Sequence, residues 1–167
     1  MKDIIIWKAF VFGDNIDTDQ IYPGRYLELV KPEDIKLHCM EGVDREFANE
    51  VEKGDIVIAG KNFGCGSSRE HAAIALISCG VSMIVAESFA RIFYRNATNL
   101  ALPLMVCKDI SRKVEDGNVL EIHIQEGTII NQSTDEILQG EKISPYILNI
   151  IEKGGIKELF REKYSKS

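Results

Sequence analysis

The sequence predicts a single domain with an α/β fold in which parallel strands are joined by helices, and two observations, the order of its elements and its length, lead to this prediction. Short apolar runs and amphipathic segments alternate from residue 55 to residue 107 in the order strand, helix, strand, helix, strand. That order is typical of parallel strands linked by crossover helices. The chain has 167 residues, the size of one domain that can bury a core without disulfides or metals. No repeat or linker divides it, so we expect residues 1–167 to form a single domain.

The elements follow in order along the chain. An apolar run typical of a strand covers residues 4–12, and the polar turn GDNIDTDQ and a loop with Pro23-Gly24 come after it. A helix is expected next, with Asp44 as its N-cap and Gly54 just past its end. The alternation then comprises strands at 55–60, 81–87 and 102–107, and helices at 67–80 and 88–100.

The last third of the chain departs from this alternation. Residues 118–131 predict a β pair with a turn at Glu126-Gly127. A closing helical segment is expected from Ser144-Pro145, with an interruption at Gly154-Gly155. We therefore expect a parallel α/β unit with an added β pair.

Composition excludes several classes of function. The net charge is −6 and no basic cluster relieves it, which argues against a nucleic-acid partner. No apolar run approaches the roughly 18 residues that span a bilayer, and the N-terminal segment is typical of a strand and not of a signal peptide, so we expect a cytoplasmic protein without a membrane segment. The cysteines form no CxxC pair and are expected to be buried thiols, with no metal held by this chain alone. They are Cys39, Cys65, Cys79 and Cys107.

The segment NFGCGSSREH, residues 62–71, lies between a predicted strand and a predicted helix, where open α/β folds place ligand sites. It is not a dinucleotide fingerprint, because Arg69 stands where the third glycine belongs. It is not a P-loop either, because no Gly-Lys-Ser/Thr follows at the required spacing. Both nucleotide-binding interpretations fail.

Two interpretations of this segment remain open from the residues alone. Ser67 and Glu70 have the spacing of a capping box, which would make the serine structural. Arg69 would lie in the first helical turn against the helix dipole, so exposed amides and this arginine would form a carboxylate or phosphate site. The serine could then act as a nucleophile or, with its oxyanion stabilised, as a base. His71 is expected to face the fold, and Cys65 is either reactive or simply small.

A second polar cluster covers residues 13–27, GDNIDTDQIYPGRYL. It does not fit a calcium loop, because Gln20 replaces the required glycine and Tyr26 stands where a bidentate glutamate belongs. Turns built by Asp and Asn side chains explain most of its composition. Arg25, beside Pro-Gly in a long loop, is a candidate substrate contact.

These two motifs together resemble the aconitase swivel domain, and within that family the free-standing small subunits of isopropylmalate and homoaconitate hydro-lyases. The resemblance runs from the first strand to about Cys107 and includes SFARIFYRNATNLALP. It implies a three-layer β/β/α domain with a largely parallel, barrel-like sheet. It also implies a heterodimer or heterotetramer with a large subunit that carries a [4Fe-4S] cluster, no cofactor in this chain, and a small hydroxy-dicarboxylate substrate.

The resemblance also implies roles for individual residues. Ser67 would be an alkoxide base that removes the proton next to the hydroxyl-bearing carbon, and Ser68 and Arg69 would support the oxyanion and bind a substrate carboxylate. Asp19 matches an acidic position that pairs with active-site groups.

The residues after Pro-Gly, Tyr26-Leu27-Glu28-Leu29, match a loop that sorts substrates by their side group. Glu28 would repel an additional carboxylate, whereas Leu27 and Leu29 suit an apolar branch, which favours isopropylmalate. Homoaconitate, methylcitrate and dimethylmalate are the alternative substrates, and a non-catalytic anion-binding scaffold is the alternative class.

Overall fold

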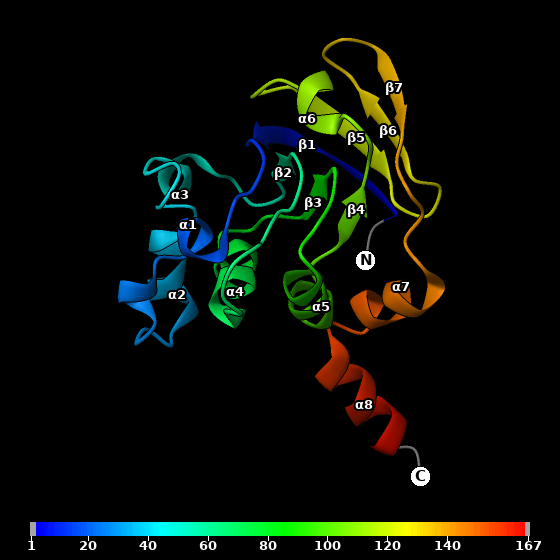
Figure 1. Ribbon diagram of the computed structural model, residues 1–167. Coiled ribbons are helices and arrows are strands. Elements are labelled where there is room, and N and C mark those ends of the chain that lie inside the picture. The colour runs from blue at the N-terminus through cyan, green and yellow to red at the C-terminus, as the bar shows by residue number, and fades with distance from the viewer. Residues whose placement is uncertain (1–2, 166–167) are drawn as a thin grey trace.

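The structure, a computed structural model, describes residues 3–165 and contains one seven-stranded sheet. The strands lie in the order β4-β3-β2-β1-β5-β6-β7, so strands adjacent in the sequence are not always neighbours in the sheet (Figure 1). Their bounds are β1 Ile4–Val11, β2 Ile56–Ala59, β3 Met83–Ala86, β4 Leu104–Val106, β5 Val119–His123, β6 Thr128–Asn131 and β7 Glu136–Gln139.

The parallel half of the sheet confirms the predicted alternation. β1, β2, β3 and β4 pair in parallel in that order. Helix α4, Glu70–Ser78, connects β2 to β3, and helix α5, Arg91–Asn99, connects β3 to β4. Gly80 ends the first of these helices as expected, with φ of +91° just past its C-cap. The carboxyl ends of β1, β2 and β3 therefore open toward one edge of the sheet.

The antiparallel half extends the predicted β pair by one strand. β5 pairs with β1, and β6 and β7 follow as hairpins, with Gly127 in the expected turn. The backbone N–H of Glu141 donates to the carbonyl of Val106 at 2.8 Å, so the chain after β7 returns to β4. This contact draws the two ends of the sheet together into a partly closed barrel.

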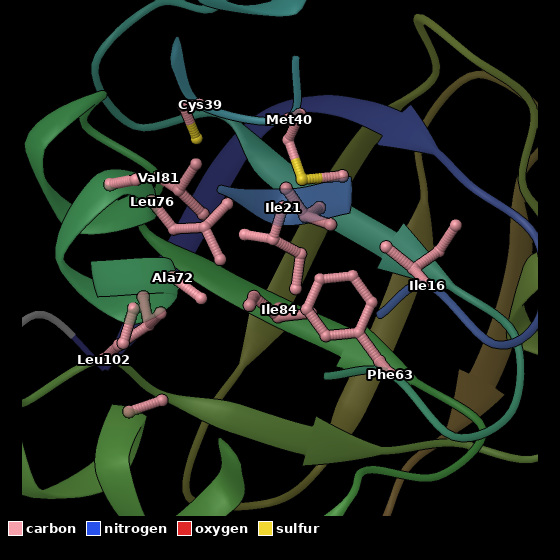
Figure 2. Packing of buried hydrophobic residues seen from close by; sticks show 14 of the residues in the cluster. Ile16, Ile21, Cys39, Met40, Phe63, Ala72, Leu76, Val81, Ile84 and Leu102 are labelled. Carbon is pink, nitrogen blue, oxygen red and sulfur yellow. The ribbon is translucent and has the colours of Figure 1, made fainter. Parts of the chain in front are cut away.

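Two hydrophobic clusters divide the fold into three layers. Along β2, Val57 and Ala59 face the helices, whereas Ile56 and Ile58 face the antiparallel strands. Figure 2 shows part of the first cluster, which is packed beneath the parallel strands. In Figure 1 the strands β5, β6 and β7 lie on one side of the parallel strands, and α4 and α5 on the other. The expected β/β/α architecture is confirmed.

The helix predicted after residue 44 is only one turn long. It is α3, Phe47–Glu50, and its N-cap is Glu46. Asp44 instead accepts the backbone N–H of Glu46 in a turn, so the N-cap prediction was wrong. The chain leaves the helix at Val51 because it must enter β2, and Gly54 lies so close to the Trp7 ring that an added Cβ would be 2.2 Å away.

The closing helices agree with the sequence, whereas several short elements were not predicted. Ser144 accepts the backbone N–H of Ile147 as the N-cap of α7, and the chain breaks at Gly154-Gly155 before the last helix. Within residues 3–165, no helix is long and apolar enough to cross a membrane. The remaining elements are α1 Thr18–Ile21, η1 Gly24–Tyr26, α2 Pro32–Ile35, η2 Lys36–His38, α6 Ile110–Lys113, α7 Pro145–Glu152 and α8 Ile156–Ser165.

Candidate active site

The candidate site is built from three loops that leave the carboxyl ends of β1, β2 and β3. Backbone hydrogen bonds connect the first two loops. The amide of Gly64 donates to the carbonyl of Ile16 at 2.7 Å, and the amide of Thr18 donates to the carbonyl of Cys65 at 2.8 Å. Phe63 and Phe89 form a parallel bridge from the second loop to the third. The topology therefore brings segments about fifty residues apart together at the edge where parallel sheets bind ligands.

Glycines are required in the second loop by backbone conformation and by space. Gly64 has φ of +85° and Gly66 has φ of +93°, which is a backbone conformation that residues with a side chain rarely adopt. A Cβ on Gly64 would also lie 2.3 Å from Cγ of Phe93, whose ring is buried. The glycines let the loop pass over the start of α5 and then deliver Ser67 to the surface.

Ser67 and Ser68 lie at one wall of a cleft of about 280 Å³. Arg69 continues this wall, and the opposite wall is formed by residues 90–93 and Asn96. The carbonyl of Ser67 accepts a hydrogen bond from Thr18 Oγ1 at 2.7 Å, which holds the backbone. Neither serine hydroxyl has a hydrogen-bond partner among residues 3–165. The cleft thus presents two unengaged hydroxyl groups on an anchored loop.

The capping box predicted for Ser67 and Glu70 is absent from this helix start. α4 begins at Glu70, its N-cap is Arg69, and no side chain caps it. A capping box occurs instead at α1, where Asp17 accepts the N–H of Gln20 at 2.8 Å and Gln20 accepts that of Asp17 at 2.9 Å. The structural interpretation of Ser67 was therefore wrong, because its hydroxyl leaves the helix start uncapped.

Asp19 and Arg69 form an ion pair across the site. Nη1 of Arg69 lies 2.6 Å from Oδ1 of Asp19, and the same oxygen accepts the amide of Gly24 at 2.9 Å. The Arg69 guanidinium, followed by the Gly24 N–H, holds the pKa of Asp19 below its ordinary value. The structure thus places both predicted residues together, and the anion that Arg69 meets is the carboxylate of Asp19.

The predicted loop of residues 25–29 does not line the cleft. Arg25 donates to Glu41 at 2.8 Å, and the hydroxyl of Tyr26 donates to the same carboxylate at 2.9 Å. The Tyr26 ring stacks on His38 with a centroid distance of 3.5 Å, and His38 in turn contacts Glu41 at 2.6 Å. Burial alone would raise the pKa of Glu41, but these hydrogen bonds hold it below its ordinary value. The start of the loop is anchored on Glu41.

The rest of this loop divides between solvent and core. Leu27 and Glu28 are exposed, whereas Leu29 is half-buried and packs against the first cluster. His71 contacts the carbonyl of Leu29 at 3.1 Å and stacks on Tyr22, so it faces the fold as expected. Within residues 3–165 no histidine hydrogen-bonds to either cleft serine, which leaves a serine–histidine nucleophile unsupported.

Sequence reasoning missed three residues of the site, and the position of two could have been inferred. Arg91 and Asn96 line the cleft because α5 begins directly after β3, at the same sheet edge as the serine loop. The role of Glu41 could not be predicted from the sequence, because its partners lie three to sixteen residues away in an irregular loop. Residues 3–165 contain no group of three metal-ligating side chains, and all four cysteines are free thiols.

Comparisons with known proteins give a consistent result. The family model described as the aconitase C-terminal domain matches residues 14–108. A 3-isopropylmalate dehydratase small subunit 1 from Methanopyrus kandleri is 51% identical over 163 residues, which cover 98% of this chain and 96% of the relative. An isopropylmalate/citramalate isomerase small subunit from Methanocaldococcus jannaschii is 48% identical over 167 residues, covering 100% and 99%.

A solved structure agrees with these sequence comparisons. The crystal structure of 3-isopropylmalate dehydratase from Methanocaldococcus jannaschii superimposes with a TM-score of 0.92 and 38% sequence identity. The match covers 96% of this chain and 95% of that one. The likeness therefore extends over both halves of the sheet.

Proposed function

The chain belongs to the aconitase C-terminal domain family, and from that premise we propose that it is the small subunit of a 3-isopropylmalate dehydratase. This hydro-lyase interconverts 2-isopropylmalate and 3-isopropylmalate by dehydration and rehydration. The observation that carries the proposal is the anchored loop at the strand ends, which presents the unengaged hydroxyl of Ser67 beside the Asp19–Arg69 pair. Relatives of nearly equal length carry the same activity in their names.

In the proposed mechanism Ser67 acts as the base. Its alkoxide takes the proton from the carbon next to the hydroxyl-bearing carbon, the electron pair forms the double bond, and hydroxide leaves. Hydroxide then adds to the carbon that lost the proton, and Ser67 returns its proton to the carbon that lost the hydroxide. Arg69 and the first amides of α4 favour the alkoxide, because positive charge and N–H dipoles at a helix start stabilise an oxyanion. Ser68 and Arg69 hold a substrate carboxylate, and Asp19 keeps the Arg69 fork in place.

The rest of the active site would come from a large subunit, with which this chain forms a heterodimer or heterotetramer in the cytoplasm. We propose that this partner carries a [4Fe-4S] cluster, which supplies Lewis-acid binding of the substrate hydroxyl and a carboxylate. The four cysteines here lie in separate segments of the fold and two of them are buried, which does not fit a cluster on this chain.

A second candidate substrate is citramalate, which also carries an apolar substituent on a malate skeleton. The observation that favours it is the 48% identity, over the whole chain, to a relative named isopropylmalate/citramalate isomerase small subunit. Glu28 is exposed and lies outside the Ser67 cleft of this chain, so we propose that it faces the substrate in the assembled enzyme, where it would disfavour a third carboxylate, as in homoaconitate and methylcitrate, by like-charge repulsion. Dimethylmalate is an apolar alternative that a substrate panel would separate.

The test uses the full chain assembled anaerobically with its large subunit. The wild-type complex should turn over isopropylmalate, and Ser67→Ala should lower kcat by about 10²–10⁴-fold with little change in KM, because a positioned base contributes that much. Ser78→Ala, at the far end of α4, is the matched control and should keep full activity. Full activity of Ser67→Ala would contradict the mechanism. A complex without turnover on any of the acids would favour a non-catalytic scaffold.

A further inference from the structure

The cleft beside Ser67 is lined by two cations and by no carboxylate among residues 3–165. Arg69 lies on the serine side, and Arg91 lies on the opposite wall at the first position of α5. The chain as a whole carries a net charge of −6, whereas both charged side chains in this lining are positive. Its lining therefore favours an anionic ligand.

The two arginines differ in what they contact. Arg69 is already paired with Asp19 at 2.6 Å, and its side chain is only 20% exposed. Arg91 is exposed, and among residues 3–165 its side chain has no hydrogen bond and no ion pair. Arg91 is thus the cation in the cleft whose donors are free to receive a ligand.

The position of Arg91 also has a cost that a ligand would remove. It lies in the first turn of α5, where the positive end of the helix dipole disfavours a cation. Arg95, one turn later, adds a second positive charge at a spacing of four residues, which is also unfavourable. A carboxylate beside Arg91 would interact favourably with the helix dipole and with both arginines, and would so offset these costs.

We propose that Arg91 binds one carboxylate of the dicarboxylate substrate across the cleft from Ser67, which rests on the proposed function. The guanidinium presents paired N–H donors that match the two oxygens of a carboxylate. Arg69, held by Asp19, binds the carboxylate nearer the serine loop, and Arg91 binds the carboxylate at the other end of the substrate. Binding at both ends places the carbon–hydrogen bond between the two walls, in front of Ser67.

A rival explanation is that Arg91 contacts the large subunit, and Arg95 allows the two to be separated. Arg95 is exposed and without a partner among residues 3–165, as Arg91 is, but it does not line the serine cleft. It lines a separate hollow of about 330 Å³ toward α7, which Arg91 also borders. If positive charge on α5 acts in a general way, substitution of either arginine should change KM. If Arg91 binds a carboxylate in the cleft, only its substitution should change KM.

The experiment compares Arg91→Gln, Arg91→Lys and Arg95→Gln in the complex with the large subunit. Arg91→Gln should raise KM for 3-isopropylmalate about ten- to a hundredfold, the effect of losing a charged hydrogen bond, with a much smaller change in kcat. Arg91→Lys should recover part of this loss, because it keeps the charge without the paired donors. Arg95→Gln should leave KM unchanged, and none of the three should change the dissociation constant between the subunits.

The outcomes separate this inference from the proposed function. If the wild-type complex turns over isopropylmalate and Arg91→Gln keeps its KM, the inference is wrong and the function stands. If Arg91→Gln weakens subunit association while KM of the saturated complex is unchanged, Arg91 is a subunit contact and the inference is again wrong. If the wild-type complex turns over none of the acids, the proposed function fails and the inference falls with it.

Discussion

Gly64→Ala tests whether the serine loop depends on a bare backbone at its closest approach to α5. The substitution places a methyl group where φ is +85° and where the nearest atom, Cγ of Phe93, would lie 2.3 Å away. Carbon atoms in contact are normally about 3.5–4.0 Å apart, so the ring must move by more than about 1 Å. Phe93 is 2% exposed and packs edge-on against Phe63 at 5.3 Å, which leaves it little room.

The magnitude follows from two contributions. A left-handed conformation costs a residue with a side chain about 1–2 kcal/mol, and overpacking a core costs about 1–3 kcal/mol. We therefore expect Gly64→Ala to lower the free energy of unfolding by about 2–5 kcal/mol. For a domain of this size, each kcal/mol corresponds to about 2–4 °C in Tm, so Tm should fall by roughly 4–20 °C.

The assay is thermal unfolding of the full chain followed by circular dichroism, with Gly66→Ala as the matched control. Gly66 has φ of +93°, but an added Cβ would meet nothing closer than 3.5 Å, so only the conformational cost of about 1–2 kcal/mol applies. The difference between the two variants measures the clash with Phe93. In a Phe93→Ala background, the loss of stability caused by Gly64→Ala should fall to that of Gly66→Ala, because the ring is then absent. Equal losses in Gly64→Ala and Gly66→Ala would refute the reasoning.

Three further predictions concern the site loops. Asp17→Ala should lower the free energy of unfolding by about 1 kcal/mol in urea titrations, because it removes the cap of α1. Ser67→Ala removes no cap and should leave this free energy unchanged. A larger loss in Ser67→Ala than in Asp17→Ala would show that Ser67 caps a helix after all. The pKa of Asp19 is lowered by Arg69 and then by the Gly24 amide, so its stabilisation is complete above about pH 4 and is lost as pH falls through the lowered pKa. Asp19→Asn should therefore show a shallower loss of stability below pH 4, by a small amount because the side chain is 66% exposed, and an unchanged acid profile would count against the ion pair. Glu28→Arg in the assembled enzyme should shift the preference from isopropylmalate toward acids with a third carboxylate, and an unchanged ratio of kcat/KM values would show that Glu28 does not sort substrates.

Much of the fold could be predicted because its causes are local. β2 and β3 are continuous apolar runs, since both of their faces are buried, and the helix between them ends at a recognisable position, Gly80. The hairpin turn at Gly127 and the N-cap at Ser144 likewise depend on residues a few positions apart. Where the responsible contact was distant, prediction failed: the helix after Asp44 shortens because the chain must enter β2 beside Trp7.

The sequence by itself determined the alternation of strands and helices, the glycine loop at a strand end and, through its motifs, the family to which the chain belongs. Only the tertiary structure decided which side chains meet at that loop. Asp19 and Arg69 are fifty residues apart, and the spacing of three that predicted a cap at Ser67 and Glu70 is the same spacing at which the cap forms between Asp17 and Gln20. Spacing along the chain reports local geometry, whereas the pairing of β1 with β2 sets which loops share an edge. The pairing of β2 with β3 likewise brings Arg91, at the start of α5, into the lining of the cleft beside Ser67.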